Sequence, residues 1–219
     1  KDNKEIVSIN QYTRHIFIIL PKKEKDTNKH AENCRLIGDI LAGRLKDVKS
    51  SLIIDVKENQ TEAMQIAEGM ALSNYTFTKH KTEEKANKLE TIYMCKNSNK
   101  KNLTELQNIV DAVYFTRNLI NEPFSHLTAK DLATAAVKSG KKYGIKTTVF
   151  NKKKIESLKM GGLLAVNKGS IDEPTFTIME WKPKTTKNKN PIVLIGKGIV
   201  YDTGGLSLKP TANSMDLMK

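Results

Sequence analysis

The sequence has little arginine, little cysteine and no long apolar run, and each shortage removes a class of function. Only Arg14, Arg35, Arg44 and Arg117 are arginines among the 37 lysine and arginine residues, so a bidentate grip on phosphate is poorly provided. No apolar stretch approaches the roughly 18 residues of a membrane span, and no signal-peptide core is visible. We therefore expect a cytoplasmic protein without a membrane partner. Cys34 and Cys95 stand far apart without CxxC or histidine spacing, which predicts buried thiols rather than a disulfide or metal pair.

The net charge of +13 is carried almost entirely by lysine. The densest cluster is Lys152-Lys153-Lys154, with Lys141, Lys142 and Lys146 shortly before it. A clustered basic face can bind phosphates nonspecifically. We interpret this cluster as a solvated face and do not expect DNA or RNA to be a partner.

The apolar pattern predicts an α/β protein with two domains, at residues 1–100 and 103–219. In the first domain the expected order is β-α-β-α-β, a small α/β domain. The boundary is expected near Asn97–Asn102, where polar residues crowd together without an apolar anchor. The expected strands and helices are Ile16–Leu20, Ala31–Leu45, Ser51–Val56, Thr61–Asn74 with Thr61 as its cap, and Thr91–Met94.

The second domain is expected to be larger and to contain a mixed sheet. It begins with a helix over Leu103–Ile120, which ends before Pro123. Thr128 and Asp131 form a capping pattern for a second helix that runs to Gly144. Strands are expected over Ile145–Phe150, Leu163–Val166, Thr175–Glu180 and Ile192–Ile195.

The stretch after the last predicted strand carries the polar groups best suited to chemistry. Its sequence is GKGIVYDTGGLSLKP, and the end of a buried strand would place it at the rim of a sheet. Lys197 could ligate a metal ion only as the neutral amine, which burial and a nearby cation both favour. Asp202 could bridge two ions, and Lys209 could face an oxyanion.

Residue types alone leave an ordinary alternative open for this stretch. A GKG sequence is also typical of a turn with a solvated lysine, and DTGG is typical of an Asx-type turn. A phosphate-binding loop is discounted because the GxxxxGK[ST] spacing is absent.

Three segments together resemble the M17 leucyl aminopeptidase family. The run from Gly196 to Pro210, continued by Asn213–Lys219, is similar to the metal-binding segment of that family. The segments Arg117–Pro123 with Leu127–Ala133, and Met160–Ser170 with Thr175–Trp181, agree in order and spacing. The resemblance covers residues from near Leu103 to Lys219.

The resemblance implies a role for each matching residue. Lys197 would ligate one metal ion, Asp202 would contact both ions, and Lys209 would polarise the scissile carbonyl and stabilise the gem-diolate. Met218 would line the pocket for the substrate's first side chain, although this chain is one residue longer between Lys209 and Met218, through Ser214. These four residues form the predicted substrate-binding set.

The implied function is that of a hydrolase, a cytoplasmic metallo-aminopeptidase that releases N-terminal, leucine-like residues from peptides. The family implies a macro-domain-like N-terminal domain, a homo-hexamer, and two divalent ions, which could be zinc, manganese or magnesium. It also implies a bicarbonate whose arginine partner lies outside this chain.

We expect the chain to be a fragment that is inactive alone. Members of the family are roughly twice this long, and their remaining carboxylate ligands have no counterpart here. The alternative function is a non-catalytic binding or regulatory module of the same fold, contacting nucleic acid through the lysine-rich face. The sequence that continues beyond Lys219 in the parent protein would separate the two hypotheses.

Overall fold

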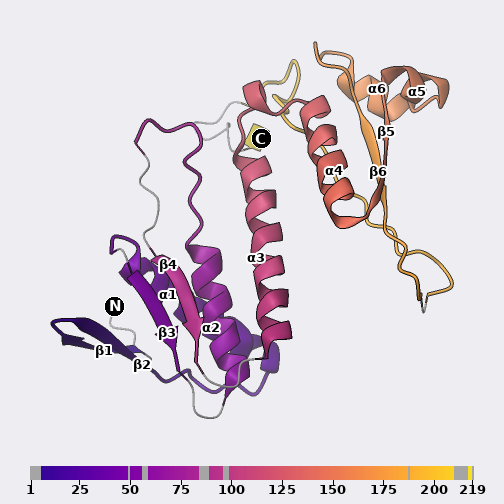
Figure 1. Ribbon diagram of the computed structural model, residues 1–219. Coiled ribbons are helices and arrows are strands. Elements are labelled where there is room, and N and C mark those ends of the chain that lie inside the picture. The colour runs from indigo at the N-terminus through magenta and orange to yellow at the C-terminus, as the bar shows by residue number, and fades with distance from the viewer. Residues whose placement is uncertain are drawn as a thin grey trace. The chain divides into compact units, whose positions relative to one another are not determined.

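The computed structural model describes residues 6–48, 50–55, 59–83, 89–95, 99–186, 188–209 and 217–218, and it has the mixed α/β character predicted from the sequence (Figure 1). The chain divides into two compact units, Lys1–Asn118 and Leu119–Lys219. Among the described residues the strands form three two-stranded sheets, β1–β2, β3–β4 and β5–β6. Over the same residues, no helix is long and apolar enough to cross a membrane.

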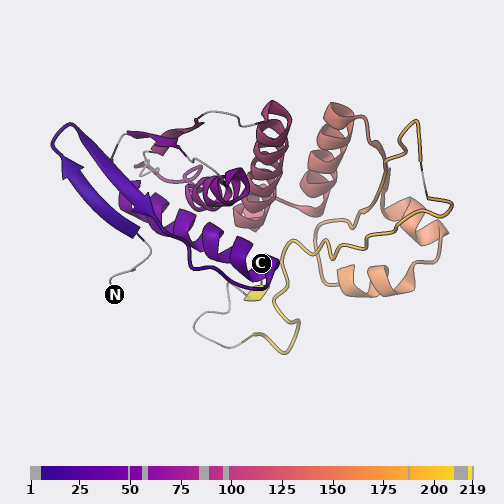
Figure 2. The ribbon, with the colours of Figure 1, turned by 90° about the horizontal axis from the view of Figure 1, so that it is seen from below.

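The first unit opens with an antiparallel hairpin of β1 (Ile6–Gln11) and β2 (Arg14–Ile19), in which Ile6 pairs with Ile19. The turn contains Tyr12 at φ 44°, a backbone conformation that non-glycine residues adopt only rarely. Strand β2 matches the predicted strand at Ile16–Leu20 within a few residues, whereas β1 is not among the predicted strands. In Figure 2 the hairpin lies beside α1.

Two helices, α1 (Thr27–Leu45) and α2 (Gln60–Ser73), build most of the core of this unit. They approach so closely that a Cβ added to Gly38 would lie 2.2 Å from the Ile66 carbonyl oxygen, and one added to Gly69 would lie 2.1 Å from the Arg35 carbonyl oxygen. Only glycine fits at such a crossing, because the backbones themselves are in contact. The helix α2 is capped by Asn59, whose side chain accepts from the Glu62 N–H, so the prediction of Thr61 as the cap is wrong.

The buried residues of the core come from the helices, the hairpin and the second sheet. Cys34 is fully buried, as predicted, whereas Cys95 is only partly buried, and no disulfide joins the two residues. The buried apolar set is Ile6, Cys34, Ile37, Leu41, Ala42, Ile54, Ala63, Ile66, Ala67, Met70 and Leu89.

Strands β3 (Ser50–Ile54) and β4 (Leu89–Met94) correspond to the predicted strands at Ser51–Val56 and Thr91–Met94, and the structure pairs them in parallel. Val56 and residues 84–88, which belong to a predicted strand and a predicted polar tract, lie outside the described residues. So do residues 96–98, where the domain boundary is expected to begin. The helix α3 (Lys100–Asn121) runs from the first compact unit into the second. The predicted domain boundary between residues 100 and 103 therefore stays a prediction.

Side chains of α3 close the C-terminal end of α2 within the first unit. The Tyr114 hydroxyl donates to the Ala71 carbonyl, and the Arg117 guanidinium donates to the Leu72 carbonyl, each at 2.5 Å. Arg117 also lies over the Tyr75 ring, 5.4 Å from its centroid. These donors satisfy carbonyls that a helix end leaves without partners inside the helix.

The second unit contains a short 3₁₀ turn η1 (Phe124–His126), helix α4 (Ala129–Tyr143) and the antiparallel pair β5 (Lys146–Phe150) and β6 (Phe176–Glu180). Helix α4 has the predicted capping box of Thr128 and Asp131, and it ends at Gly144 with φ 68°. Between the two strands lie the short helices α5 (Lys152–Ser157) and α6 (Gly161–Asn167).

Two predicted strands of this unit are wrong. Leu163–Val166 is part of the helix α6, and its Leu-Leu-Ala sequence has good helix propensity, which outweighs the apolar run. Ile192–Ile195 is extended coil, with the four side chains 72% to 94% exposed. A β-branched run becomes a strand only when neighbouring backbone pairs with it, and no described segment does so here.

Candidate functional site

The candidate site is a loop over residues 201–209 in the second unit, and its shape depends on two glycines. The Asp202 carboxylate oxygen Oδ1 accepts from the Gly204 N–H at 2.9 Å, which makes the Asx-type turn considered from the sequence. Gly204 has φ 89° and Gly205 has φ 75°, so both lie in the left-handed region. A Cβ on Gly204 would meet the Ser207 carbonyl oxygen at 2.6 Å, so the turn is open only to glycine.

Lys209 closes this loop with its backbone and its side chain. Its N–H donates to the Thr203 carbonyl at 3.0 Å. Its Nζ lies 2.8 Å from the Asp202 carbonyl oxygen, 2.9 Å from the Leu217 carbonyl oxygen and 3.2 Å from Asp202 Oδ2. An ammonium group has three N–H donors, and here three acceptors surround it. The structure thus brings together two of the predicted site residues, Asp202 and Lys209.

The surroundings of Asp202 favour its charged form. The Gly204 N–H, the Lys209 ammonium and the more distant charge of Lys197 together hold the pKa of this carboxyl below its ordinary value of 3.8. The carboxylate is therefore ionised at neutral pH, and with its side chain 44% exposed it can still be reached from solvent.

Lys197 stands apart from this pair. It is exposed in a coil, and within the described residues no hydrogen bond or ion pair joins it to Asp202. A Cβ on Gly196 would meet no atom within 4 Å, so this glycine does not mark a close approach in the structure. The prediction that Lys197 follows the end of a strand is wrong, because Ile192–Ile195 is not a strand, while its proposed ligand role stays a prediction.

Met218 contacts the start of the loop, and it is buried, with 8% of its surface exposed. Its carbonyl oxygen accepts from the Asp202 N–H at 2.7 Å. Its sulfur accepts from the Tyr201 hydroxyl at 3.2 Å, and the Tyr201 ring stacks on Phe124 with centroids 5.6 Å apart. Sequence reasoning did not single out Tyr201 or Phe124, although Tyr201 directly precedes Asp202. Pro210, Ser214 and Lys219 lie outside the described residues.

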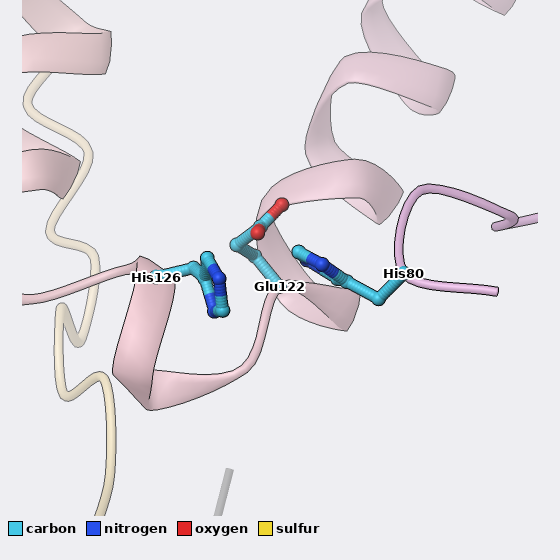
Figure 3. Close-up of side chains that lie close together, drawn as sticks. All are labelled: His80, Glu122 and His126. Carbon is cyan, nitrogen blue, oxygen red and sulfur yellow. The ribbon is translucent and has the colours of Figure 1, made fainter. Parts of the chain in front are cut away.

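Glu122 and His126 form a second group of possible ligands in this unit (Figure 3). Glu122 is 6% exposed and His126 is exposed, and their ligand atoms lie within 4.8 Å of each other. His80, which is also drawn in Figure 3, belongs to the first unit. Sequence analysis did not single out this pair, because the two residues show no recognised metal-ligand spacing. Two ligands are fewer than the four of a structural zinc site, so the pair carries no metal assignment.

The fold of the chain is that of leucine aminopeptidases. A solved structure of a tomato leucine aminopeptidase mutant superposes with a TM-score of 0.77 at 20% identity, covering 91% of this chain and 42% of that one. The bottromycin maturation enzyme BotP in complex with Mn gives a TM-score of 0.76 at 21% identity, covering 96% of this chain and 46% of that one. At these identities the likeness concerns the fold alone.

The sequence comparisons identify the family. Residues 114–219 match the catalytic domain of the cytosol aminopeptidase family, M17. A probable cytosol aminopeptidase of Protochlamydia amoebophila is 42% identical over 177 residues, covering 76% of this chain and 35% of that protein. One from Chlorobaculum parvum is 59% identical over 103 residues, covering 47% of this chain and 20% of that protein. Residues 114–219 of the chain are therefore a segment of the catalytic domain of the M17 cytosol aminopeptidase family.

The matched residues span 35% of the Protochlamydia amoebophila protein and 20% of the Chlorobaculum parvum protein. The chain thus covers only part of what their whole sequences carry.

The predicted donors Asp202 and Lys197 fit divalent ions in kind, although Lys197 lies outside the loop of residues 201–209 and no described hydrogen bond or ion pair joins it to Asp202. A carboxylate and a neutral amine are ligands that zinc and manganese accept, and Asp202 is ionised and reachable. Each oxygen of a carboxylate has a second lone pair beyond the one used by its hydrogen bond. Asp202 and Lys197 would therefore suit the family's metal ions, although two side chains do not complete the coordination of two ions.

Proposed function

We propose that the whole protein containing these residues is a cytosolic aminopeptidase that removes N-terminal, leucine-like residues from peptides. The observation that carries this proposal is the loop of residues 201–209, in which an ionised Asp202 and a cationic Lys209 converge beside the buried Met218. It lies within the segment that matches the family's catalytic domain.

Each of the four predicted site residues has a proposed task. Asp202 and Lys197 would hold the divalent ions, zinc or manganese, and these ions would supply a Lewis acid and a water of lowered pKa. Lys209 would donate to the carbonyl oxygen of the scissile bond as negative charge develops on it. Met218 would line the pocket for the first side chain. We further propose the hexamer and the bicarbonate that the family implies.

The present geometry supports Lys209 as the oxyanion donor in two ways. Its ammonium is fixed by two backbone carbonyls, so it does not have to be ordered when substrate binds. Its third acceptor, Asp202 Oδ2, lies at the longest distance of the three, 3.2 Å. We assign the Lys209 N–H that faces Asp202 Oδ2 to the oxygen of the substrate carbonyl.

The test is Lys209→Ala in the whole protein, measured by turnover of leucine p-nitroanilide and by metal content. Loss of one preorganised oxyanion donor costs about 100- to 1000-fold in kcat, and we expect the metal content to stay unchanged. The matched control is Lys189→Ala, which removes an exposed lysine from the coil after β6. Lys197→Ala is expected to lower metal content.

Two results would contradict the assignment of Lys209. Undiminished turnover would remove Lys209 from the mechanism. Loss of metal together with turnover would show that Lys209 only holds the loop in shape.

A further inference from the structure

Resting on the proposed function, we propose that Tyr201 is a positioning residue that sets the preference for the substrate's first side chain by holding Met218 in one conformation. Tyr201 is not among the residues predicted from the family pattern. The inference concerns a hydroxyl group whose bond to the Met218 sulfur is seen in the structure.

The Tyr201 side chain is anchored at both of its ends. Its ring stacks on Phe124 of η1 with centroids 5.6 Å apart and an angle of 29° between the ring planes. Its hydroxyl donates to the Met218 sulfur at 3.2 Å. A ring held by stacking has few alternative positions, so the hydroxyl presents a fixed donor to the sulfur.

Met218 needs such a partner if it is to form a wall of defined shape. A methionine side chain is unbranched and has three rotatable bonds, and it adapts to whatever space surrounds it. Met218 is buried, and its backbone carbonyl is fixed by the Asp202 N–H at 2.7 Å. The backbone bond fixes where the side chain starts, and the Tyr201 hydroxyl fixes where its sulfur lies.

The two bonds to Met218 come from adjacent residues. Tyr201 holds the side chain, and Asp202 holds the main chain while its carboxylate contacts Lys209. The predicted pocket wall and the predicted reacting groups are therefore joined through one dipeptide. Removing the Tyr201 hydroxyl alone would release the Met218 side chain without disturbing Asp202 or Lys209, because the ring stacking and the backbone hydrogen bond remain.

The experiment uses Tyr201→Phe in the whole protein and compares kcat/KM for leucine and alanine p-nitroanilides. With its sulfur released, Met218 can occupy part of the pocket or leave it, so the discrimination between side chains falls. We expect the leucine-to-alanine ratio to fall by about 2- to 10-fold, the range of one modest hydrogen bond. Metal content is expected to stay unchanged. Tyr12→Phe removes the same atom from a fully exposed tyrosine and is expected to leave the ratio unchanged.

A double-mutant cycle with Met218→Leu tests whether the effect passes through the sulfur. Leucine has a similar volume and no acceptor atom, so Tyr201→Phe should change the ratio no further in that background. In parallel, the methyl signal of Met218 in a protein labelled with ¹³C-methyl methionine should shift in Tyr201→Phe and stay in place in Tyr12→Phe.

The outcomes separate this inference from the proposed function. If the unmodified protein cleaves both substrates and Tyr201→Phe leaves the ratio unchanged, the assignment to Tyr201 is wrong and the proposed function stands. An equal change in both backgrounds of the cycle would also overturn the assignment. An unmodified, metal-loaded protein that cleaves neither substrate would overturn the proposed function and the assignment together.

Discussion

At the scale of single residues, short local contacts determine the charge that a side chain carries. His30 of α1 lies 2.8 Å from Glu62 of α2, and its other ring nitrogen contacts the Lys22 carbonyl. The hydrogen bond to Glu62 raises the pKa of His30 above its ordinary value of 6.5, against a smaller opposing effect of desolvation. The charged pair joins two helices of the first unit.

This pair makes the contact between α1 and α2 depend on pH. Because the folded pKa of His30 is raised, its contribution to stability is complete below about pH 6.5 and is lost as pH rises through the folded value. We expect His30→Gln to weaken hydrogen-exchange protection of α1 and α2 at pH 5.5 and to have little effect at pH 8.5, once intrinsic exchange rates are corrected for. His15→Gln, at an exposed position of β2, is the control. A loss of protection that is equal at both pH values would contradict this linkage.

Residue contacts within a few positions of sequence could be predicted, and contacts between distant positions could not. The capping box of Thr128 and Asp131 follows from their spacing alone. The bond from Tyr201 to Met218 spans 17 positions, and the stacking of Phe124 on Tyr201 spans far more. Neither has a signature in spacing, because tertiary packing decides them.

At the scale of elements, the crossing of α1 and α2 brings two helix backbones into direct contact. Gly38 and Gly69 face each other's helix so closely that each backbone occupies the place of the other's missing Cβ. Helical spacing of apolar residues predicted both helices, but it gave no reason for these glycines. Only the crossing itself supplies that reason.

Gly38→Ala is expected to lower the free energy of unfolding by about 1–3 kcal/mol or more, because the new methyl group meets backbone that cannot turn away. Gly43→Ala is the matched control on the same helix, where an added Cβ meets nothing within 4 Å. There we expect stabilisation of about 0.5–1 kcal/mol from helix propensity. Urea unfolding followed by far-ultraviolet circular dichroism measures both. Similar changes in the two variants would show that the crossing is looser than the structure indicates.

Elements with amphipathic periodicity were predicted more successfully than short apolar runs. The long helices α1, α2, α3 and α4 all correspond to predicted helices, with ends that differ by a few residues. The apolar runs at Leu163–Val166 and Ile192–Ile195 are typical of strands, but neither is a strand in the structure. Such runs suit a buried helix as well as a strand, so only their neighbours decide between them.

At the scale of the whole molecule, the family and the fold class were recognisable from sequence because three motif segments agree in order. The arrangement of the candidate site was only partly accessible. Asp202 and Lys209 come together as the motif leads one to expect, whereas Lys197 lies in exposed coil outside that contact. A motif preserves residue types and spacing, but the position of each side chain depends on the segments packed around it.

We expect the 219 residues alone to bind no pair of divalent ions tightly and to hydrolyse no peptide. Their predicted ligands, Lys197 and Asp202, supply two donors, whereas catalytic zinc sites use three protein ligands for each ion. Titration with zinc or manganese by calorimetry, beside a leucine p-nitroanilide assay, measures both properties. Tight binding of two ions per chain would show that other residues of this chain complete the coordination. Asp202→Asn would then identify whether this carboxylate takes part.

The surroundings of Lys209 also restrict which amino acid can stand there. The carbonyl oxygens of Asp202 and Leu217 and the Asp202 carboxylate oxygen Oδ2 all surround Lys209 Nζ, and each can accept one N–H hydrogen bond from it. Arginine spreads its protons over a flat fork of three nitrogens, and glutamine has only two to give. Of these three side chains, lysine alone therefore matches the acceptors around this position in both the number and the geometry of its protons.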